Sequence, residues 1–333
     1  MIKTGLLDPE RTVPFVIEYD SDNGRPASGL LTSWYQDNLE FVEAKLLEHG
    51  AILFRGFEIN TPAAFARLTR SLTPGLLDCL DDNGPRTKIT SGIYTSTEYP
   101  PAYQLSMHSE YAYSHKFPSR LFFCCIVEPG KGGETPLADN RKILAKLDAG
   151  VVQEFRNRRI KYLRNLHGGN GFGLSWQAAF QTTDKSAVEA YCRDMSIGYD
   201  WKADGGLRLE NVFESVITHP RTGEEVWFNQ APQFHPSDYP NDVYESLLNS
   251  FRGKENDMPQ TSLFGDDSPI EIEKLRHIRE TMFKEATVSP WRQGDVVMLD
   301  NVLVCHGRMP YSGPRKILLA MTGNYDGKRN AGN

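Results

Sequence analysis

Apolar residues in the first quarter of the chain recur at helical spacing and then form a short continuous run. Residues 38–49 (NLEFVEAKLLEH) predict a helix that ends at Gly50, because glycine readily adopts the left-handed conformation that closes a helix. The run AILFRGF at 51–57 predicts a short buried strand. Thr61 and Pro62 then supply the N-cap and the first helical position of a second helix.

From about residue 103 onward, β-branched and aromatic residues gather in runs that are typical of strands. The segment 105–113 is one such candidate, and RLFFCCIV at 120–127 is the most β-prone run of the chain. Residues 215–230 predict a hairpin, with two β-prone runs around a glycine-containing turn. The last third predicts strands at 295–301 and 316–324, joined by the segment HGRMPYSGPR.

Helical segments are interspersed with these strands. Further helices are predicted at RKILAKLD and the segment after it, at KSAVEAYCRDM behind the N-cap candidate Asp184, at 242–251 and at 270–286. This order predicts an α+β protein with a double-stranded β-helix, or jelly-roll, core and flanking and inserted helices. A generic α+β fold fits the periodicity nearly as well.

The chain has no internal repeat and no low-complexity linker, so residues 1–333 are expected to form a single domain. Within that domain we expect a helical N-terminal part at about 30–75 and an insert at about 165–212. The glycine-rich and aromatic stretch 167–181 (HGGNGFGLSWQAAFQ) of this insert is predicted to act as a lid.

Charge and cysteine usage narrow the classes of partner. The net charge of −6 and the scattered lysines and arginines provide no basic surface for nucleic acid or an anionic membrane. No apolar run approaches the roughly 20 residues of a membrane-spanning helix, and the N-terminus lacks the pattern of a signal peptide. Five cysteines without C-x-x-C spacing favour reduced thiols, which predicts a cytoplasmic location.

The candidate chemistry centres on His108-Ser109-Glu110. If 105–113 is a strand, His108 and Glu110 point to the same face and offer an imidazole nitrogen and a carboxylate oxygen to one metal ion. A third ligand from a distant strand would complete a facial triad with open coordination positions. His306, just after the strand at 295–301, is the candidate.

Other interpretations of these residues stay open on the motif alone. An isolated H-x-E is often accidental, and a lone histidine is more often a satisfied polar side chain than a ligand. His235 lies beside a predicted strand and is the strongest rival ligand. The remaining rivals by residue type are His115, His167 and His219.

Three separate blocks of the chain resemble the TauD/TfdA family of dioxygenases, and most closely its SyrP-like and clavaminate-synthase-like branch. The blocks are AILFRGF, the stretch from YTSTEYP through MHSEYAYSH to PSRLFFCCIVEPGKGGETPLADNRKIL, and WRQGDVVMLDNVLVCHGRMPYSGPRKILLAM. They occur in the family's order between about residues 50 and 323. The resemblance implies a jelly-roll oxygenase that uses iron(II), 2-oxoglutarate and molecular oxygen.

Carried onto matching positions, the resemblance implies that His108, Glu110 and His306 bind the iron. A carboxylate at position 110 also counts against halogenation, because related halogenases carry a small residue there. Arg315 matches the arginine that binds the far carboxylate of 2-oxoglutarate, with Lys316 as runner-up, and Thr135 matches a threonine that assists it. A guanidinium suits this task because it makes two parallel hydrogen bonds to a carboxylate.

The substrate follows less directly. The branch acts mostly on amino acids, either free or tethered to a carrier protein, in specialised biosynthesis, so the resemblance implies an amino-acid-like small molecule. The candidates for substrate contact are Tyr94, Thr97, Glu98 and Arg308, the last at the pocket mouth. Leu319 occupies the position of a second arginine in the family's sulfonate enzymes, which disfavours a sulfonate.

The expected reaction is hydroxylation of an unactivated C–H bond, coupled to decarboxylation of 2-oxoglutarate to succinate. The same centre performing desaturation, cyclisation or rearrangement is an alternative, as is a jelly-roll protein that binds a metal without oxygenase activity. The sequence does not indicate an oligomeric state.

Overall fold

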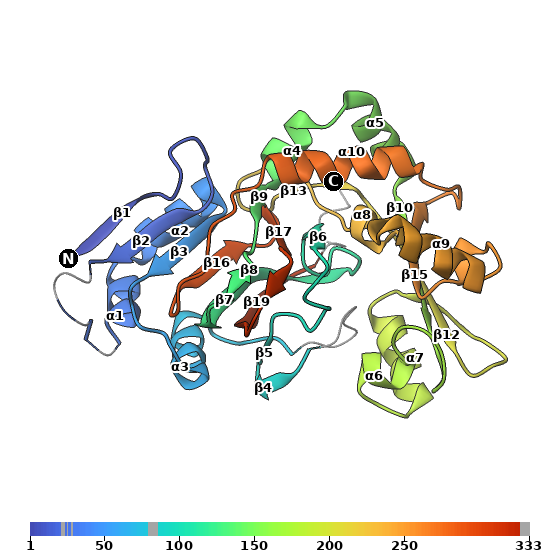
Figure 1. The fold of residues 1–333 in the computed structure, drawn as a ribbon, viewed down its shortest axis with the longest axis horizontal. Helices are drawn as coiled ribbons and strands as arrows, with labels where there is room; N and C mark the ends of the chain where they lie inside the picture. Colours follow the sequence, from blue (N-terminus) through green and yellow to red (C-terminus); the bar gives the residue numbers. More distant parts are fainter. Residues whose placement is uncertain (21–23, 25, 28, 79–85, 327–333) are drawn as a thin grey trace.

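The largest sheet of the molecule has eight strands, which are antiparallel except for one parallel pair (Figure 1). The computed structural model describes residues 1–20, 24, 26–27, 29–78 and 86–326. The strands follow one another in the order β1 (Ile2–Leu6), β2 (Phe15–Tyr19), β3 (Ala51–Arg55), β16 (Val296–Asp300), β7 (Lys116–Val127), β19 (Lys316–Asp326), β5 (Ile93–Thr95) and β4 (Lys88–Thr90). Segments nearly 250 residues apart in sequence, such as β3 and β16, therefore pair directly.

Both faces of this sheet are buried, which explains the continuous apolar run in β7. Phe122 and Cys124 face a core shared with α1 (Leu30–Asp37), α2 (Leu39–His49) and α3 (Pro62–Leu72). Phe123 and Cys125 belong to a second core on the opposite face. Alternate residues of one strand thus serve two different cores, as the period of two in a strand requires.

The second core lies between the large sheet and a smaller one. The smaller sheet has three strands, in the order β6 (Leu105–His108), β17 (Val304–Arg308) and β9 (Leu137–Asp139). The ring of Phe123 lies 5.0 Å from the ring of His306 in β17, so the two sheets approach each other closely at this point. Two sheets around a shared interior confirm the predicted α+β class with a jelly-roll core.

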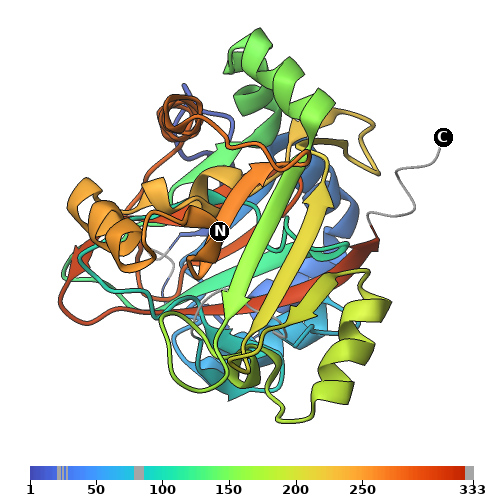
Figure 2. The same cartoon turned by 90° about the vertical axis from the view of Figure 1, so that its right-hand side faces the viewer.

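A further four-stranded sheet flanks this core, and it faces the viewer in Figure 2. Its order is β11 (Gly198–Trp201), β12 (Leu207–Phe213), β10 (Ile160–Leu166) and β15 (Gln260–Phe264). α6 (Trp176–Phe180) and α7 (Lys185–Asp194) pack against its end in a third apolar cluster that includes Trp176, Cys192 and Leu207. The hydrophobic pattern predicted none of these strands, and only β11 and most of β12 lie within the predicted insert at about 165–212.

The remaining elements connect and cover these sheets. They are α4 (Asn140–Lys146), α5 (Ala149–Arg158), α8 (Ala231–Phe234), α9 (Asn241–Ser250), α10 (Ile272–Lys284), the hairpin of β13 (Val216–Thr218) with β14 (Glu225–Trp227), and the short pair of β8 (Lys131–Gly132) with β18 (Tyr311–Ser312). Among the described residues, every helix is too short or too polar to cross a lipid bilayer. The division into a single domain with a separate N-terminal part and insert stays a prediction.

Local signals in the sequence are confirmed where they rest on backbone chemistry. Gly50 ends α2 with a φ of 73°, and the Thr61 hydroxyl accepts a hydrogen bond from the Ala64 amide at the start of α3. Asp184 caps α7 by accepting from the Ser186 amide. These signals act over a few residues, so the sequence alone determines them.

Two predictions for the chemically important segments were wrong in detail. The strand predicted at 105–113 ends at His108, and Glu110 lies in a turn that follows it. The segment that begins at His306 was predicted as a connection, yet Val304–Arg308 forms strand β17. Both differences arise because pairing between β6 and β17 is a long-range interaction that local patterning does not reveal.

Candidate metal centre and cavity

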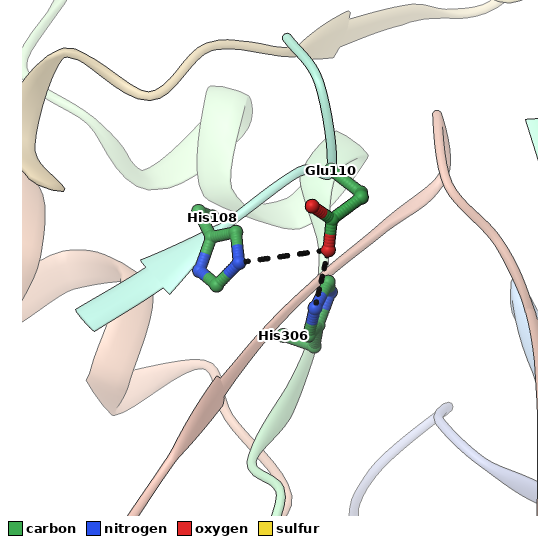
Figure 3. Close-up of side chains that lie close together, drawn as sticks. All are labelled: His108, Glu110 and His306. Atoms are coloured by element: carbon green, nitrogen blue, oxygen red, sulfur yellow. Dashed lines mark ion pairs between the residues drawn. The ribbon is translucent and has the colours of Figure 1, made fainter. Parts of the chain in front are cut away.

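Three side chains from two separated parts of the chain meet in the interior between the sheets. His108 ends β6 and His306 lies in β17, and these two residues are direct cross-strand partners in the antiparallel pair. His108, Glu110 and His306 each offer one ligand atom, and these atoms all lie within 4.8 Å of one another (Figure 3). All three residues are buried.

The distances leave a gap at the centre of the cluster. Oε2 of Glu110 lies 3.6 Å from Nε2 of His306 and 4.0 Å from Nε2 of His108 (Figure 3). Hydrogen bonds between nitrogen and oxygen span about 2.7–3.2 Å, so these atoms converge without bonding one another. Two imidazole nitrogens and one carboxylate oxygen form a donor set that suits a first-row divalent ion such as iron(II).

Glu110 reaches the cluster from a turn because its backbone is held by a partner on another segment. The Glu110 amide donates to Oδ1 of Asn301 at 2.7 Å, and Nδ2 of Asn301 donates to the Glu110 carbonyl at 2.8 Å. Asn301 directly follows β16 and is fully buried. A side-chain amide thus replaces the strand ladder that the sequence predicted for this position.

The two oxygens of the Glu110 carboxylate have different surroundings. Nη2 of Arg86 donates to Oε1 at 2.9 Å, whereas Oε2 faces the two histidines. Burial acts to raise the pKa of this carboxyl, but Arg86 and the two histidines outweigh it and hold the pKa below its usual range. Glu110 is therefore an anion with one oxygen directed at the gap.

The orientation of His108 is set by its second nitrogen. Nδ1 of His108 lies 2.8 Å from the Ser106 carbonyl, so Nδ1 carries the proton and Nε2 keeps a lone pair toward the gap. Burial, reinforced by repulsion from His306, lowers the pKa of His108 to about 4. Nδ1 of His306 is buried and has no hydrogen-bond partner among the described residues.

The rival histidines are committed elsewhere. Nε2 of His235 lies 2.6 Å from Glu255, and its Nδ1 contacts Ser237. The other three also contact residues outside the cluster. Nε2 of His219 lies 3.1 Å from Asp300, and Nδ1 of His167 accepts from the Gly169 amide at 3.1 Å. The centre of the His115 ring lies 4.6 Å from that of Phe213.

A cavity of about 140 Å³ opens beside the cluster, and both residues predicted to bind the co-substrate line it. Arg315 donates from Nε to the Gly133 carbonyl at 2.9 Å, and burial lowers its pKa to about 10. Thr135 accepts a hydrogen bond from Nε1 of Trp291 at 3.2 Å. Lys316 starts β19, and it does not line the cavity.

The four predicted substrate residues divide into two pairs. Thr97 and Arg308 line the cavity. Tyr94 and Glu98 do not: the Tyr94 hydroxyl donates to Asp78 at 2.6 Å, and Glu98 is an exposed carboxylate that accepts from the Thr87 and Thr95 hydroxyls.

Arg308 is buried and lines the cavity, and its predicted place at the pocket mouth stays a prediction. Its guanidinium donates to the carbonyls of Tyr99, Pro100 and Tyr103 at 2.6–2.7 Å. These contacts tie the loop 99–103 to the strand that carries His306. Cys305 points away from the cluster, as expected, with its thiol 3.6 Å from the Ala138 carbonyl.

Sequence reasoning missed several residues of the site. Arg86 and Asn301 hold Glu110; Arg86 lies outside the three blocks, and Asn301 lies within the last block but was given no role. Polar side chains from the segments 230–239 and 260 also line the cavity: Gln230, Gln233, Asp238, Tyr239 and Gln260. The predicted lid at 167–181 contributes no residue to the cavity wall, and its role as a lid stays a prediction.

Comparisons with known proteins agree with this geometry. The family model described as "Taurine catabolism dioxygenase TauD, TfdA family" matches residues 24–322. The dapdiamide synthesis protein DdaC of Enterobacter agglomerans is 40% identical over 280 residues, which cover 84% of each chain. A clavaminate synthase-like protein of Arabidopsis thaliana is 27% identical over 303 residues, covering 88% of this chain and 87% of that protein.

Among solved structures, PvcB of Pseudomonas aeruginosa has the same fold, with a TM-score of 0.56 and 14% identity over 98% of this chain and 94% of that one.

Proposed function

This chain belongs to the TauD/TfdA family of dioxygenases, and we propose that His108, Glu110 and His306 hold the iron(II) of its active site. As a member of that family, it is a 2-oxoglutarate-dependent non-haem iron dioxygenase that uses iron(II), 2-oxoglutarate and molecular oxygen. The observation that carries the assignment of residues is the convergence of three buried donor atoms within 4.8 Å that do not hydrogen-bond one another.

The chain's own residues prepare this site in defined ways. The Ser106 carbonyl holds His108 in the tautomer that presents Nε2, and Arg86 occupies Oε1 of Glu110, which leaves Oε2 for the metal. The buried position excludes bulk water from the donors. When bound, iron(II) with 2-oxoglutarate would activate molecular oxygen, the oxidant, so that one oxygen atom goes to an unactivated C–H bond and the other to succinate as carbon dioxide leaves.

We assign the far carboxylate of 2-oxoglutarate to Arg315, with Thr135 as a second donor. Arg315 makes no ion pair with any described residue, although it is a half-buried cation on the cavity wall whose pKa is lowered by desolvation. A buried charge is costly without a partner of opposite sign, and a carboxylate would provide one. Thr135 lines the same cavity and can donate its hydroxyl proton while accepting from Trp291.

For the substrate, we infer an amino-acid-derived small molecule of specialised metabolism, most simply hydroxylated at a C–H bond. The relative DdaC acts in dapdiamide synthesis, which supports a biosynthetic role. Of the predicted contacts, Thr97 and Arg308 remain candidates for binding the substrate because they line the cavity. Attachment to a carrier protein, the alternatives of desaturation, cyclisation or rearrangement, and a cytoplasmic location stay predictions.

The test is anaerobic addition of iron(II) and then 2-oxoglutarate to the metal-free protein. Chelation of iron by the co-substrate is expected to produce a weak visible charge-transfer band, and admission of oxygen should release succinate. A protein fully loaded with iron that produced no band would contradict the proposed arrangement and would favour a metal-binding role without oxygenase activity. A subsequent screen of amino acids, free and carrier-linked, by product mass identifies the oxidised compound.

A further inference from the structure

We propose that the cavity recognises its substrate through neutral amide groups, so that the compound oxidised carries an amide in place of a free amino group. This inference rests on the oxygenase function proposed above and adds the chemical class of the substrate. It comes from a contrast within the cavity wall, where each carboxylate already has a cationic partner and several carboxamides have unused hydrogen-bonding groups.

The two carboxylates that line the cavity, within the described part of the chain, each have a cationic partner. Arg86 pairs with Glu110 at 2.9 Å, and Oδ1 of Asp238 lies 3.0 Å from Nε of Arg279 while it accepts from the Ser106 hydroxyl at 2.5 Å. An arginine therefore already balances the charge of each carboxylate, so a substrate ammonium group would add an uncompensated positive charge.

The two remaining cations can each meet an anionic group. Arg315 is the residue assigned to 2-oxoglutarate. Arg308 donates to three backbone carbonyls of the loop 99–103 and makes no ion pair with a described residue, and its buried Nε has no hydrogen-bond partner among them. A substrate carboxylate therefore has a partner in Arg308, whereas burying a substrate ammonium without an opposite charge is strongly unfavourable.

The carboxamides differ from these charged groups. Gln104, Gln230, Gln233 and Gln260 all line the cavity. Gln230 is the most constrained: Nε2 donates to the Ser109 carbonyl at 2.7 Å, which fixes the orientation of the amide. Its Oε1 is buried and has no hydrogen-bond partner among the described residues. A buried acceptor left unsatisfied costs about 1–3 kcal/mol, so a donor supplied by a ligand would stabilise the complex.

The other carboxamides are less enclosed than Gln230. Gln104 is exposed and Gln233 is half-buried, and their side chains make no hydrogen bond within the described residues. Nε2 of the half-buried Gln260 reaches only the Gln233 carbonyl, at the long distance of 3.5 Å. Gln230 and Gln233 are three residues apart around the start of α8, a spacing that places two side chains on the same side of a helical turn.

A carboxamide offers one acceptor and two donors, which is the complement of another amide. Several such groups on one wall can bind an amide without either partner carrying a charge. The reaction that supplies this substrate is then formation of an amide bond, and oxidation follows it. A substrate whose amino group is acylated fits this cavity better than the free amino acid.

The test compares two mixtures on the protein loaded anaerobically with iron(II) and 2-oxoglutarate. One mixture contains free amino acids, and the other contains the corresponding N-acetyl amino acids, whose amino group is blocked as an amide. Binding is read from the change in the charge-transfer band and from saturation-transfer NMR. We expect the best blocked amide to bind at least about tenfold more tightly than its free counterpart. Equal or tighter binding of the free amino acids, or no binding of either mixture at millimolar concentration, overturns the proposal.

Variants localise the effect to the cavity wall. Gln233→Leu is expected to weaken binding of the best blocked amide about tenfold and to leave the affinity for 2-oxoglutarate unchanged. Gln230→Leu should weaken it further. Gln153→Leu is the matched control, because Gln153 is exposed on α5 and does not line the cavity. Unchanged binding in both cavity variants contradicts the inference.

Failure of this inference can be distinguished from failure of the proposed function. If the wild-type protein forms no charge-transfer band, the assignment of the metal and co-substrate residues is wrong. If the band forms normally and amides show no advantage, only the substrate class is wrong.

Discussion

Two groups of buried histidine and carboxylate lie in this molecule, and they differ in how completely they are satisfied. Nε2 of His219 lies 3.1 Å from Asp300, and Nδ1 of His219 accepts from the backbone amides of Arg221 and Thr222. The other Asp300 oxygen accepts from the amides of Val302 and Leu303. Each hydrogen-bonding position in this pair is used within the protein.

The cluster of His108, Glu110 and His306 is the opposite case. Its donor atoms approach to 3.6 and 4.0 Å without a hydrogen bond, and Nδ1 of His306 has no partner among the described residues. Both groups combine buried histidine with a buried carboxylate. The comparison therefore shows that convergence of unsatisfied lone pairs, and not the presence of buried histidine and carboxylate, indicates a metal site.

The largest effect is expected for loss of a ligand. His306→Ala should lower the affinity for iron(II) by more than about 100-fold. Loss of a residue that only supports a ligand can cost roughly 100-fold, and here the ligand itself is removed. Anaerobic titration with iron(II) and the iron content after dialysis measure it. His219→Ala is the matched control and should keep its iron. Iron retention in His306→Ala at the wild-type level would remove the distinction between the two groups.

The same control variant, His219→Ala, is expected to lower the free energy of unfolding. His219→Ala leaves Asp300 buried without its imidazole partner, and breaking a buried pair in this way typically costs about 3–5 kcal/mol of stability. Urea unfolding of the metal-free protein measures the loss. If His306→Ala destabilised the metal-free protein as strongly as His219→Ala, His306 would contribute as much to folding stability as His219, and the contrast between the two groups would be lost.

Removal of the proposed co-substrate arginine separates metal binding from 2-oxoglutarate binding. Arg315→Ala should keep iron and lose about 2–5 kcal/mol of 2-oxoglutarate binding, equivalent to roughly 30-fold or more. Titration of the charge-transfer band measures this, with Lys316→Ala as the neighbouring control. Normal co-substrate binding in Arg315→Ala would transfer the assignment to Lys316 or Arg308.

The smallest effect is a pH dependence that marks His108 as neutral in the folded protein. Its folded pKa of about 4 lies below the value of about 6.5 in an unfolded chain. As the pH falls from 7 toward 5, the unfolded state takes up a proton that the folded state does not, so stability decreases. The loss reaches at most about 1.4 kcal/mol per pH unit.

Urea unfolding of the metal-free protein at pH 7, 6 and 5 measures this dependence. His108→Gln should flatten it over that range. A slope that is unchanged in the variant would show that other groups are responsible.

Much of the site could be predicted because its metal-binding and co-substrate candidates lie within sequence blocks that resemble a known family. His108, Glu110 and His306 are brought together as expected, and Arg315 and Thr135 line the adjoining cavity. The prediction of the geometry was weaker than the prediction of the residues. Alternation along a strand was expected to align His108 with Glu110, whereas the strand ends at His108 and Asn301 holds the turn.

The sequence by itself determined the elements whose signals are local, such as the end of α2 at Gly50 and the cap of α3 at Thr61, and it determined which residue types were available for a metal. Only the tertiary structure decided which histidines meet, since cross-strand pairing of β6 with β17 joins residues almost 200 positions apart. It also decided that Arg86, Asn301 and the cavity glutamines belong to the site. Their roles depend on partners distant in sequence, and no short-range pattern of hydrophobic and polar residues encodes such contacts.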